Sequence, residues 1–154
     1  MEGEEVDWKK LTRLDRVLVV AGLLFVVDLL ALPWVDVSIG PVSFTSSGTG
    51  SPDGFLGVLA VLVALGIVAD VALQRFSSVR LPSLSVGPGA TRLIAAAAAL
   101  GLVVVKLLLH LHPSYLGFGC WAALAIGTVL VVAAHRSSAE ASAPSTTASA
   151  PNQN

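Results

Sequence analysis

Charged residues are scarce in this sequence of 154 residues. Asp, Glu, Lys and Arg make up 12% of it, whereas apolar residues make up 55%. A soluble domain is about a quarter charged, because a surface that faces water needs such groups. The scarcity of charge, together with a mean hydropathy of +0.82, indicates one domain whose surface mostly faces a lipid bilayer.

Basic charge and cysteine are also in short supply. The formal net charge is −1, which excludes the basic field that attracts nucleic acid. The single cysteine, Cys120, excludes an internal disulfide and any metal site built from several cysteines.

Four apolar runs are long enough to cross a hydrocarbon core about 30 Å thick, which takes about 20 helical residues. They cover about residues 14–33, 55–73, 90–112 and 115–134. Leu, Val and Ala fill them without alternation, which disfavours barrel strands, and a helix satisfies its own backbone groups in lipid. The sequence therefore predicts an all-α fold, a four-helix transmembrane bundle over residues 14–134.

The basic residues lie on one side of these runs. Apart from Lys106, every Lys and Arg residue lies before or at the start of the first run, in or beside the connection between the second and third, or after the fourth. The positive-inside rule then places both termini in the cytoplasm of a cell that carries the protein in its plasma membrane. The alternative is a first run that is removed as a signal peptide, which would leave three spans. Asp28 within the run and the lack of an A-x-A cleavage site disfavour it.

The terminal segments lie outside the predicted membrane domain. The cytoplasmic segment 1–13 fits either a short helix at the interface, with Trp8 at headgroup depth, or a solvated tail. The cytoplasmic tail, 135–154, contains no large apolar residue. It cannot bury enough surface to offset the entropy of ordering, so we expect it to be disordered.

The first outer connection predicts a small β-hairpin. β-Branched or aromatic residues alternate with polar ones in VDVSI and VSF, on either side of Gly40-Pro41. We expect its apolar face to rest on the outer ends of the helices. Such a cap either recognises something outside the membrane or shields the helix ends.

Two opposite charges lie at matched depth in the first and third runs. At 1.5 Å per residue, Asp28 lies about 7 Å and Lys106 about 10 Å below the outer boundary. Each charge costs at least about 2.5–3.5 kcal/mol at a helix centre, so both are functional candidates. We predict an intramembrane ion pair, Asp28–Lys106, either direct or bridged by water. Lys106 can also extend toward the outer headgroups.

Asp70 lies near the inner end of the second run. One interpretation is an inner-interface carboxylate that pairs with Arg16 or Arg92 at similar depth. The other is a proton- or cation-binding carboxylate. That role needs polar groups continuing outward, but residues 57–69 are Gly and aliphatic residues only.

Catalytic and metal-binding constellations are not evident. His110 and His112, at i and i+2, point to different faces of a helix. No base accompanies Cys120 at its depth apart from this pair, and there is no Gly-rich phosphate loop. We therefore expect that the chain has no catalytic residue, metal or cofactor and that it is not an enzyme.

Small residues recur every four positions in the fourth run, at Gly119, Ala123 and Gly127. Such a stripe lets a neighbouring helix approach closely. It predicts helix packing within the chain, and the same stripe could serve a homo-oligomer or another membrane protein. The alternative is that Ala and Gly are simply common in this chain.

Three segments together resemble a known group of proteins: LLALPWVDVS, DGFLGVLAVL and KLLLHLHPSYLGFGCWAALAIGTVL. Residues 14–134 resemble small four-span membrane proteins from actinobacteria. That set has no established activity, so the resemblance implies a topology and no catalytic or binding residue.

Three functions are compatible with these features. The favoured one is an accessory or structural component of the cell envelope that acts through helix and loop contacts. The alternatives are a transporter or channel subunit that uses Asp28 and Lys106, and an intramembrane enzyme.

Overall fold

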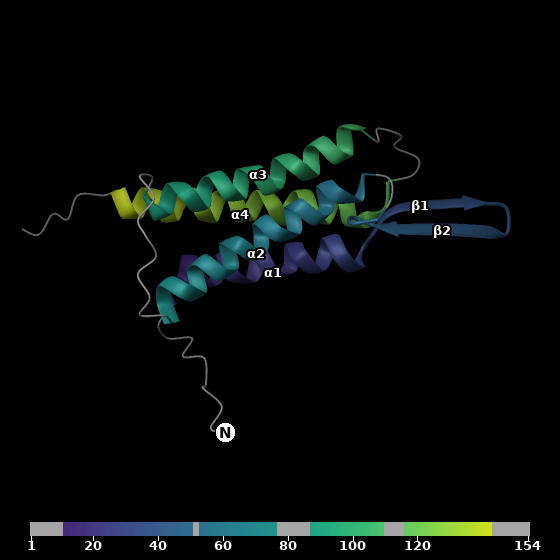
Figure 1. The fold of residues 1–154 in the computed structure, drawn as a ribbon. Helices are drawn as coiled ribbons and strands as arrows, with labels where there is room; N and C mark the ends of the chain where they lie inside the picture. The colour runs from purple at the N-terminus through teal and green to yellow at the C-terminus, as the bar shows by residue number, and fades with distance from the viewer. Residues whose placement is uncertain (1–10, 51–52, 77–86, 110–115, 143–154) are drawn as a thin grey trace, which may run out of the picture.

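The computed structural model of the chain describes residues 11–50, 53–76, 87–109 and 116–142. These residues form four helices and a two-stranded antiparallel sheet (Figure 1). The helices are α1 (Arg13–Ala31), α2 (Gly54–Phe76), α3 (Pro88–Leu109) and α4 (Phe118–Ser142), and the strands are β1 (Pro33–Ile39) and β2 (Val42–Ser47). The interpretations of residues 1–10, of His110 and His112, and of residues 143–154 fall outside the described residues.

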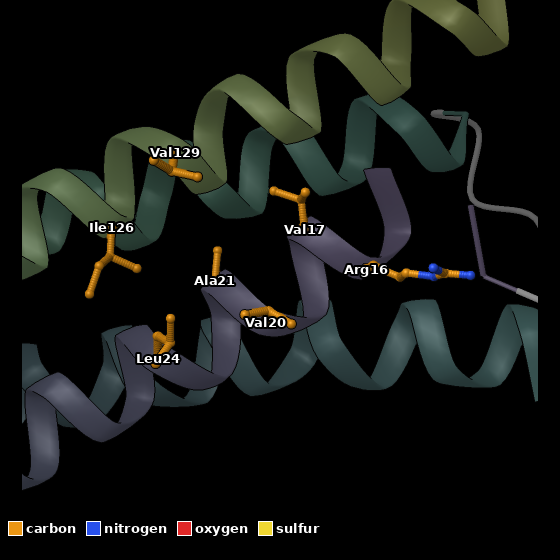
Figure 2. A pocket seen from close by; sticks show the side chains of 7 residues that line it. All are labelled: Arg16, Val17, Val20, Ala21, Leu24, Ile126 and Val129. Atoms are coloured by element: carbon orange, nitrogen blue, oxygen red, sulfur yellow. The ribbon is translucent and has the colours of Figure 1, made fainter. Parts of the chain in front are cut away.

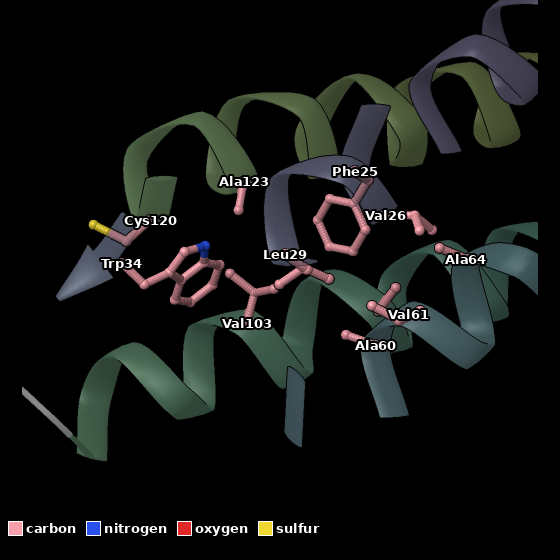
Figure 3. Close-up of a cluster of buried hydrophobic side chains, with 11 residues drawn as sticks. Phe25, Val26, Leu29, Trp34, Ala60, Val61, Ala64, Val103, Cys120 and Ala123 are labelled. Carbon is pink, nitrogen blue, oxygen red and sulfur yellow. The ribbon is translucent and has the colours of Figure 1, made fainter. Parts of the chain in front are cut away.

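The helices lie side by side, and α1 and α3 each pack against α2 and α4. One cluster of buried side chains, which includes Phe25, Leu29 and Trp34, lies toward the hairpin (Figure 3). A second cluster, which includes Leu18 and Ile67, follows toward the opposite end. The two clusters fill the space between the helices with apolar side chains over most of its length.

The outward faces of the helices are also apolar. Large exposed side chains occur on every helix, among them Leu24, Leu62, Leu108 and Val129. Three helical segments are long and apolar enough to cross a membrane, namely Gly54–Phe76, Gly89–Leu109 and Phe118–Glu140. Together these features support a multi-pass membrane protein, because water does not favour so much exposed apolar surface.

Helix α1 has clear local signals at both ends. At its start, Thr12 and Asp15 form a capping box: the Asp15 N–H donates to Thr12 Oγ1 at 3.2 Å, and the Thr12 N–H donates to Asp15 Oδ2 at 3.1 Å. At its end, Pro33 disfavours a helical conformation at Leu32, which is extended. The helix therefore stops at Ala31, slightly before the predicted end of the first span.

Helix α4 is longer than predicted. The expected span ended at residue 134 and the expected disorder began at residue 135, but α4 continues to Ser142. Adding a residue to an existing helix costs far less than starting one, and the added residues include good helix formers such as Ala and Glu. The expectation of disorder is therefore wrong for residues 135–142.

The predicted hairpin is confirmed as a two-stranded antiparallel sheet. Ile39 pairs with Val42, so Gly40 and Pro41 form a two-residue turn. Gly40 has a φ of 61°, as a type II′ turn requires at its first central position.

The position of the hairpin differs from the expected one. Its strands continue beyond the helix ends, so the tip stands away from them (Figure 1). Val42 and Phe44 are 67% and 65% exposed, whereas Trp34 at the base is 4% exposed. Only the base of the hairpin packs on the helices. Strands of this length extend roughly 20 Å, so the tip lies beyond the helix ends.

Candidate functional site

Trp34 joins the two charged residues that lie near the hairpin. Asp28 is in the last turn of α1, Lys106 is in the last turn of α3, and Trp34 follows Pro33 at the start of β1. The Trp34 Nε1–H donates to Asp28 Oδ2 at 3.3 Å, and Lys106 Nζ lies 5.7 Å from the centre of the Trp34 ring. Asp28, Trp34 and Lys106 are 1%, 4% and 7% exposed, so the site is inside the protein.

Lys106 also holds the chain that follows the hairpin, the cap loop (residues 48–50). Its ammonium donates to the carbonyl of Gly48 and, at 3.2 Å, to the carbonyl of Gly50. The Thr49 N–H donates to the Leu29 carbonyl at 3.1 Å. These bonds tie the cap loop to α1 and α3, and they satisfy the Lys106 charge with backbone oxygens.

Gly57 makes the position of the cap loop possible. A Cβ at Gly57 would overlap the Gly48 carbonyl oxygen and lie 2.8 Å from the Gly48 carbonyl carbon. A residue with a side chain here would push Gly48 outward, away from Lys106. The cap loop therefore depends on a missing side chain in α2.

The predicted direct ion pair between Asp28 and Lys106 needs correction. The structure brings both residues to one site, but the salt bridges among the described residues do not include one between them. Each contacts Trp34 instead, because the chain reverses at Pro33 and returns the indole to the helices. A water-bridged contact stays a prediction. Asp28 Oδ1 is buried and has no hydrogen-bond partner among the residues that the structure describes.

A second polar cluster, the Arg92 network, lies at the other end of the helices. The buried Arg92 donates from Nε to Asp70 Oδ2 at 2.7 Å and from Nη2 to Gln74 Oε1 at 2.8 Å. Its Nη1 lies 3.5 Å from Asp15 Oδ1, and Arg75 Nη2 lies 2.6 Å from Asp15 Oδ2. These five residues connect α1, α2 and α3.

The Arg92 network distinguishes between the two predicted partners of Asp70. Arg92 pairs with Asp70. Gln74 donates to the other oxygen of Asp70 at 2.8 Å, so both oxygens of this carboxylate have partners. These contacts fit the inner-interface carboxylate better than a proton- or cation-binding one.

Sequence reasoning missed several members of the two sites. Asp15 was visible as the last residue of a Thr-x-x-Asp capping box before an apolar run. Gln74 lies four residues after Asp70 and therefore on the same helix face. No pattern in the sequence indicated that the cap-loop carbonyls accept hydrogen bonds from Lys106, or that Trp34 contacts both Asp28 and Lys106.

The small-residue stripe of α4 lies in the interior. A Cβ at Gly119 would be 2.7 Å from Trp34 Cδ1, and one at Gly127 would be 2.9 Å from Leu100 Cδ1. Ala123 is fully buried between them. The stripe is thus used for packing within the chain, against β1, α1 and α3.

The polar side chains of both sites contact one another, the backbone or an aromatic ring. Within the described ranges, no group of three or more His, Cys, Asp or Glu residues could hold a metal ion. Cys120 is buried, and its Sγ donates to the Gly117 carbonyl at 3.0 Å. Comparison with protein-family models, with curated proteins and with solved structures finds no match to this chain.

Proposed function

We propose that this chain is a four-span protein of the plasma membrane that acts by contact, as an accessory or structural component of the cell envelope. The observation that carries the proposal is the exposed apolar tip of the hairpin. Val42 and Phe44, two residues apart on β2, point to the same side of the strand, and both are mostly exposed. Apolar side chains held away from the rest of the molecule are suited to contact with another protein.

The contacts at the base support this function. Lys106 and the Leu29 carbonyl hold the cap loop, and Trp34 anchors β1. A hairpin held in one place loses less conformational entropy when it binds than a mobile loop does. The contacts of Trp34 and Lys106 thus act as supports for the projecting hairpin.

The proposed topology includes α1 as a fourth span. Residues 17–27 of α1 carry no charge. The charges near its ends, Asp15 and Asp28, are buried against partners from the same protein rather than exposed to lipid. The distribution of Lys and Arg supports cytoplasmic termini and an outer hairpin. The resemblance to small four-span actinobacterial proteins is part of the same proposal.

Photo-cross-linking at the hairpin tip tests the proposal. A photoreactive phenylalanine at position 44 should give one discrete adduct in intact cells, and mass spectrometry of the purified adduct should identify the same protein in each preparation. Position 45 is the matched control, because Thr45 is the next residue and points to the other side of β2. Equal adducts at both positions, or none at position 44, would refute the proposal.

One observation favours a second function, that of a transporter or channel subunit. Within the described part of the chain, Asp28 Oδ1 is buried without a hydrogen-bond partner, as a carboxylate that binds a proton or cation can be. Proton or cation flux into vesicles that contain the purified protein, abolished by Asp28→Asn, would establish this function. Absence of flux from the parent protein would reject it.

A further inference from the structure

A groove runs along the outward side of the contact between α1 and α4. Its volume is about 370 Å³, and its apolar lining consists of Val17, Val20, Ala21, Leu24, Ile126 and Val129 (Figure 2). Most of these side chains are exposed, so the groove opens to the surroundings of the protein. The lining side chains offer no hydrogen-bonding group, so the part of a ligand that lies among them must be hydrocarbon.

Arg16 lies at one end of this groove. In Figure 2 its guanidinium points away from the apolar side chains, toward the beginning of α1. An arginine near a membrane boundary extends in this way to bring its charge to headgroup depth. The groove therefore has a hydrocarbon-lined part and a cationic end.

Further basic residues continue the cationic end. Arg13 precedes Arg16 by three residues and Val20 by seven, so it belongs to the same face of α1. On α4, Arg136 follows Val129 by seven residues and likewise shares its face. Glu140 is one turn further along α4, and the nearby Asp15 is turned inward to Arg75 and Arg92. Among the described residues, positive charge therefore predominates where the groove ends.

We propose that this groove binds an anionic phospholipid of the cytoplasmic leaflet. One acyl chain lies along the α1–α4 contact, and Arg16 contacts the phosphate. A phospholipid carries in one molecule an acyl chain for the hydrocarbon-lined part of the groove and a phosphate for its cationic end. Net negative charge distinguishes the preferred lipid from a zwitterionic one, because basic residues between helices at the cytoplasmic side attract anionic headgroups. The assignment to the cytoplasmic leaflet rests on the proposed topology, whereas the proposed binding of an anionic phospholipid to the groove does not.

Native mass spectrometry of the full chain tests the proposal in neutral detergent, with equimolar phosphatidylglycerol and phosphatidylcholine. Phosphatidylglycerol should be the predominant bound lipid. Arg16→Gln should weaken its binding about fivefold, the change that corresponds to about 1 kcal/mol for one arginine near the headgroups. Arg16→Lys should retain most of the preference.

The apolar part of the groove has its own matched pair of variants. Val20→Trp should fill the groove and reduce the bound phospholipid, whereas Leu62→Trp, on the exposed face of α2, should leave binding unchanged. Circular dichroism of each variant establishes that it is folded. If Arg16→Gln does not fold, Val20→Trp provides the test of the proposal. Equal binding of the two lipids, or equal effects of the two tryptophans, would overturn the proposal. Because the assay uses no partner protein, its outcome is independent of the hairpin cross-link.

Discussion

At the scale of single residues, Trp34 has the properties that its two charged neighbours need. Its indole N–H is a donor only, which suits the Asp28 carboxylate, and its ring face attracts the Lys106 ammonium. Removing one partner from a buried polar contact leaves the other unsatisfied, and that cost exceeds the net value of the bond. The three residues therefore act as one unit.

Trp34→Phe tests this unit, because it retains an aromatic ring and removes the donor. We expect it to lower the free energy of unfolding by about 1–3 kcal/mol, since Asp28 loses its hydrogen bond. The same substitution in an Asp28→Leu background should cost clearly less. Reversible unfolding in mixed micelles, followed by circular dichroism, measures all four proteins. Equal losses in the two backgrounds would show that the bond does not contribute to stability.

At the scale of elements, Arg92 is the residue that joins three helices at one end. Its planar guanidinium donates in three directions, to Asp15 on α1 and to Asp70 and Gln74 on α2. A lysine ammonium cannot reproduce this planar arrangement. The polar contacts that join α1, α2 and α3 therefore depend on the shape of the Arg92 side chain as well as on its charge.

Arg92→Lys should lower the free energy of unfolding by about 3 kcal/mol, because it breaks a buried, paired network. Arg75→Gln is the control, since the Arg75 side chain is 38% exposed and water shields its contact with Asp15. That control should cost under about 1 kcal/mol. Denaturation in mixed micelles compares the two variants, and a smaller loss for Arg92→Lys than for the control would contradict the assigned role.

The contact between α2 and the cap loop leads to a second prediction at this scale. Gly57→Ala should destabilise the protein by about 1–3 kcal/mol, because its Cβ overlaps the Gly48 backbone. Gly66→Ala, in the same helix, is the control. Among the described residues, no atom beyond the neighbouring backbone of α2 lies within 4 Å of a Cβ at Gly66, so this variant should be at least as stable as the parent. Thermal unfolding in detergent measures both, and similar midpoints would argue against the close contact.

At the scale of the whole molecule, the proposed topology predicts which positions a membrane-impermeant maleimide reaches. In a Cys120→Ala background, a cysteine at Ser43 in the hairpin should be labelled in intact cells. Cysteines at Gly3 and at Ala139 should be labelled only after lysis. Gly3 decides whether α1 crosses the membrane, because it lies outside the cell if α1 is retained without crossing, and it is lost if the first run is removed as a signal peptide. Labelling of Gly3→Cys in intact cells would reject the four-span topology.

Much of the architecture was predictable because it depends on the composition and spacing of residues that are near one another in the sequence. Runs of Leu, Val and Ala predict helices in lipid wherever they are long enough, and alternation around Gly40-Pro41 predicts a hairpin. The end of α4 was not predictable in the same way. Its last residues are too polar to read as a span, yet they extend an existing helix.

The sequence by itself determined the apolar helices, the hairpin and the common depth of Asp28 and Lys106, since each follows from local composition and spacing. Only the tertiary structure decided which polar groups meet. The reversal at Pro33 brings Trp34 to both charges, and Gly57 lets Gly48 approach Lys106. These contacts depend on the directions of side chains from elements far apart in the sequence. No periodicity encodes those directions, so the structure has contacts through an indole and a backbone loop where a direct ion pair was predicted.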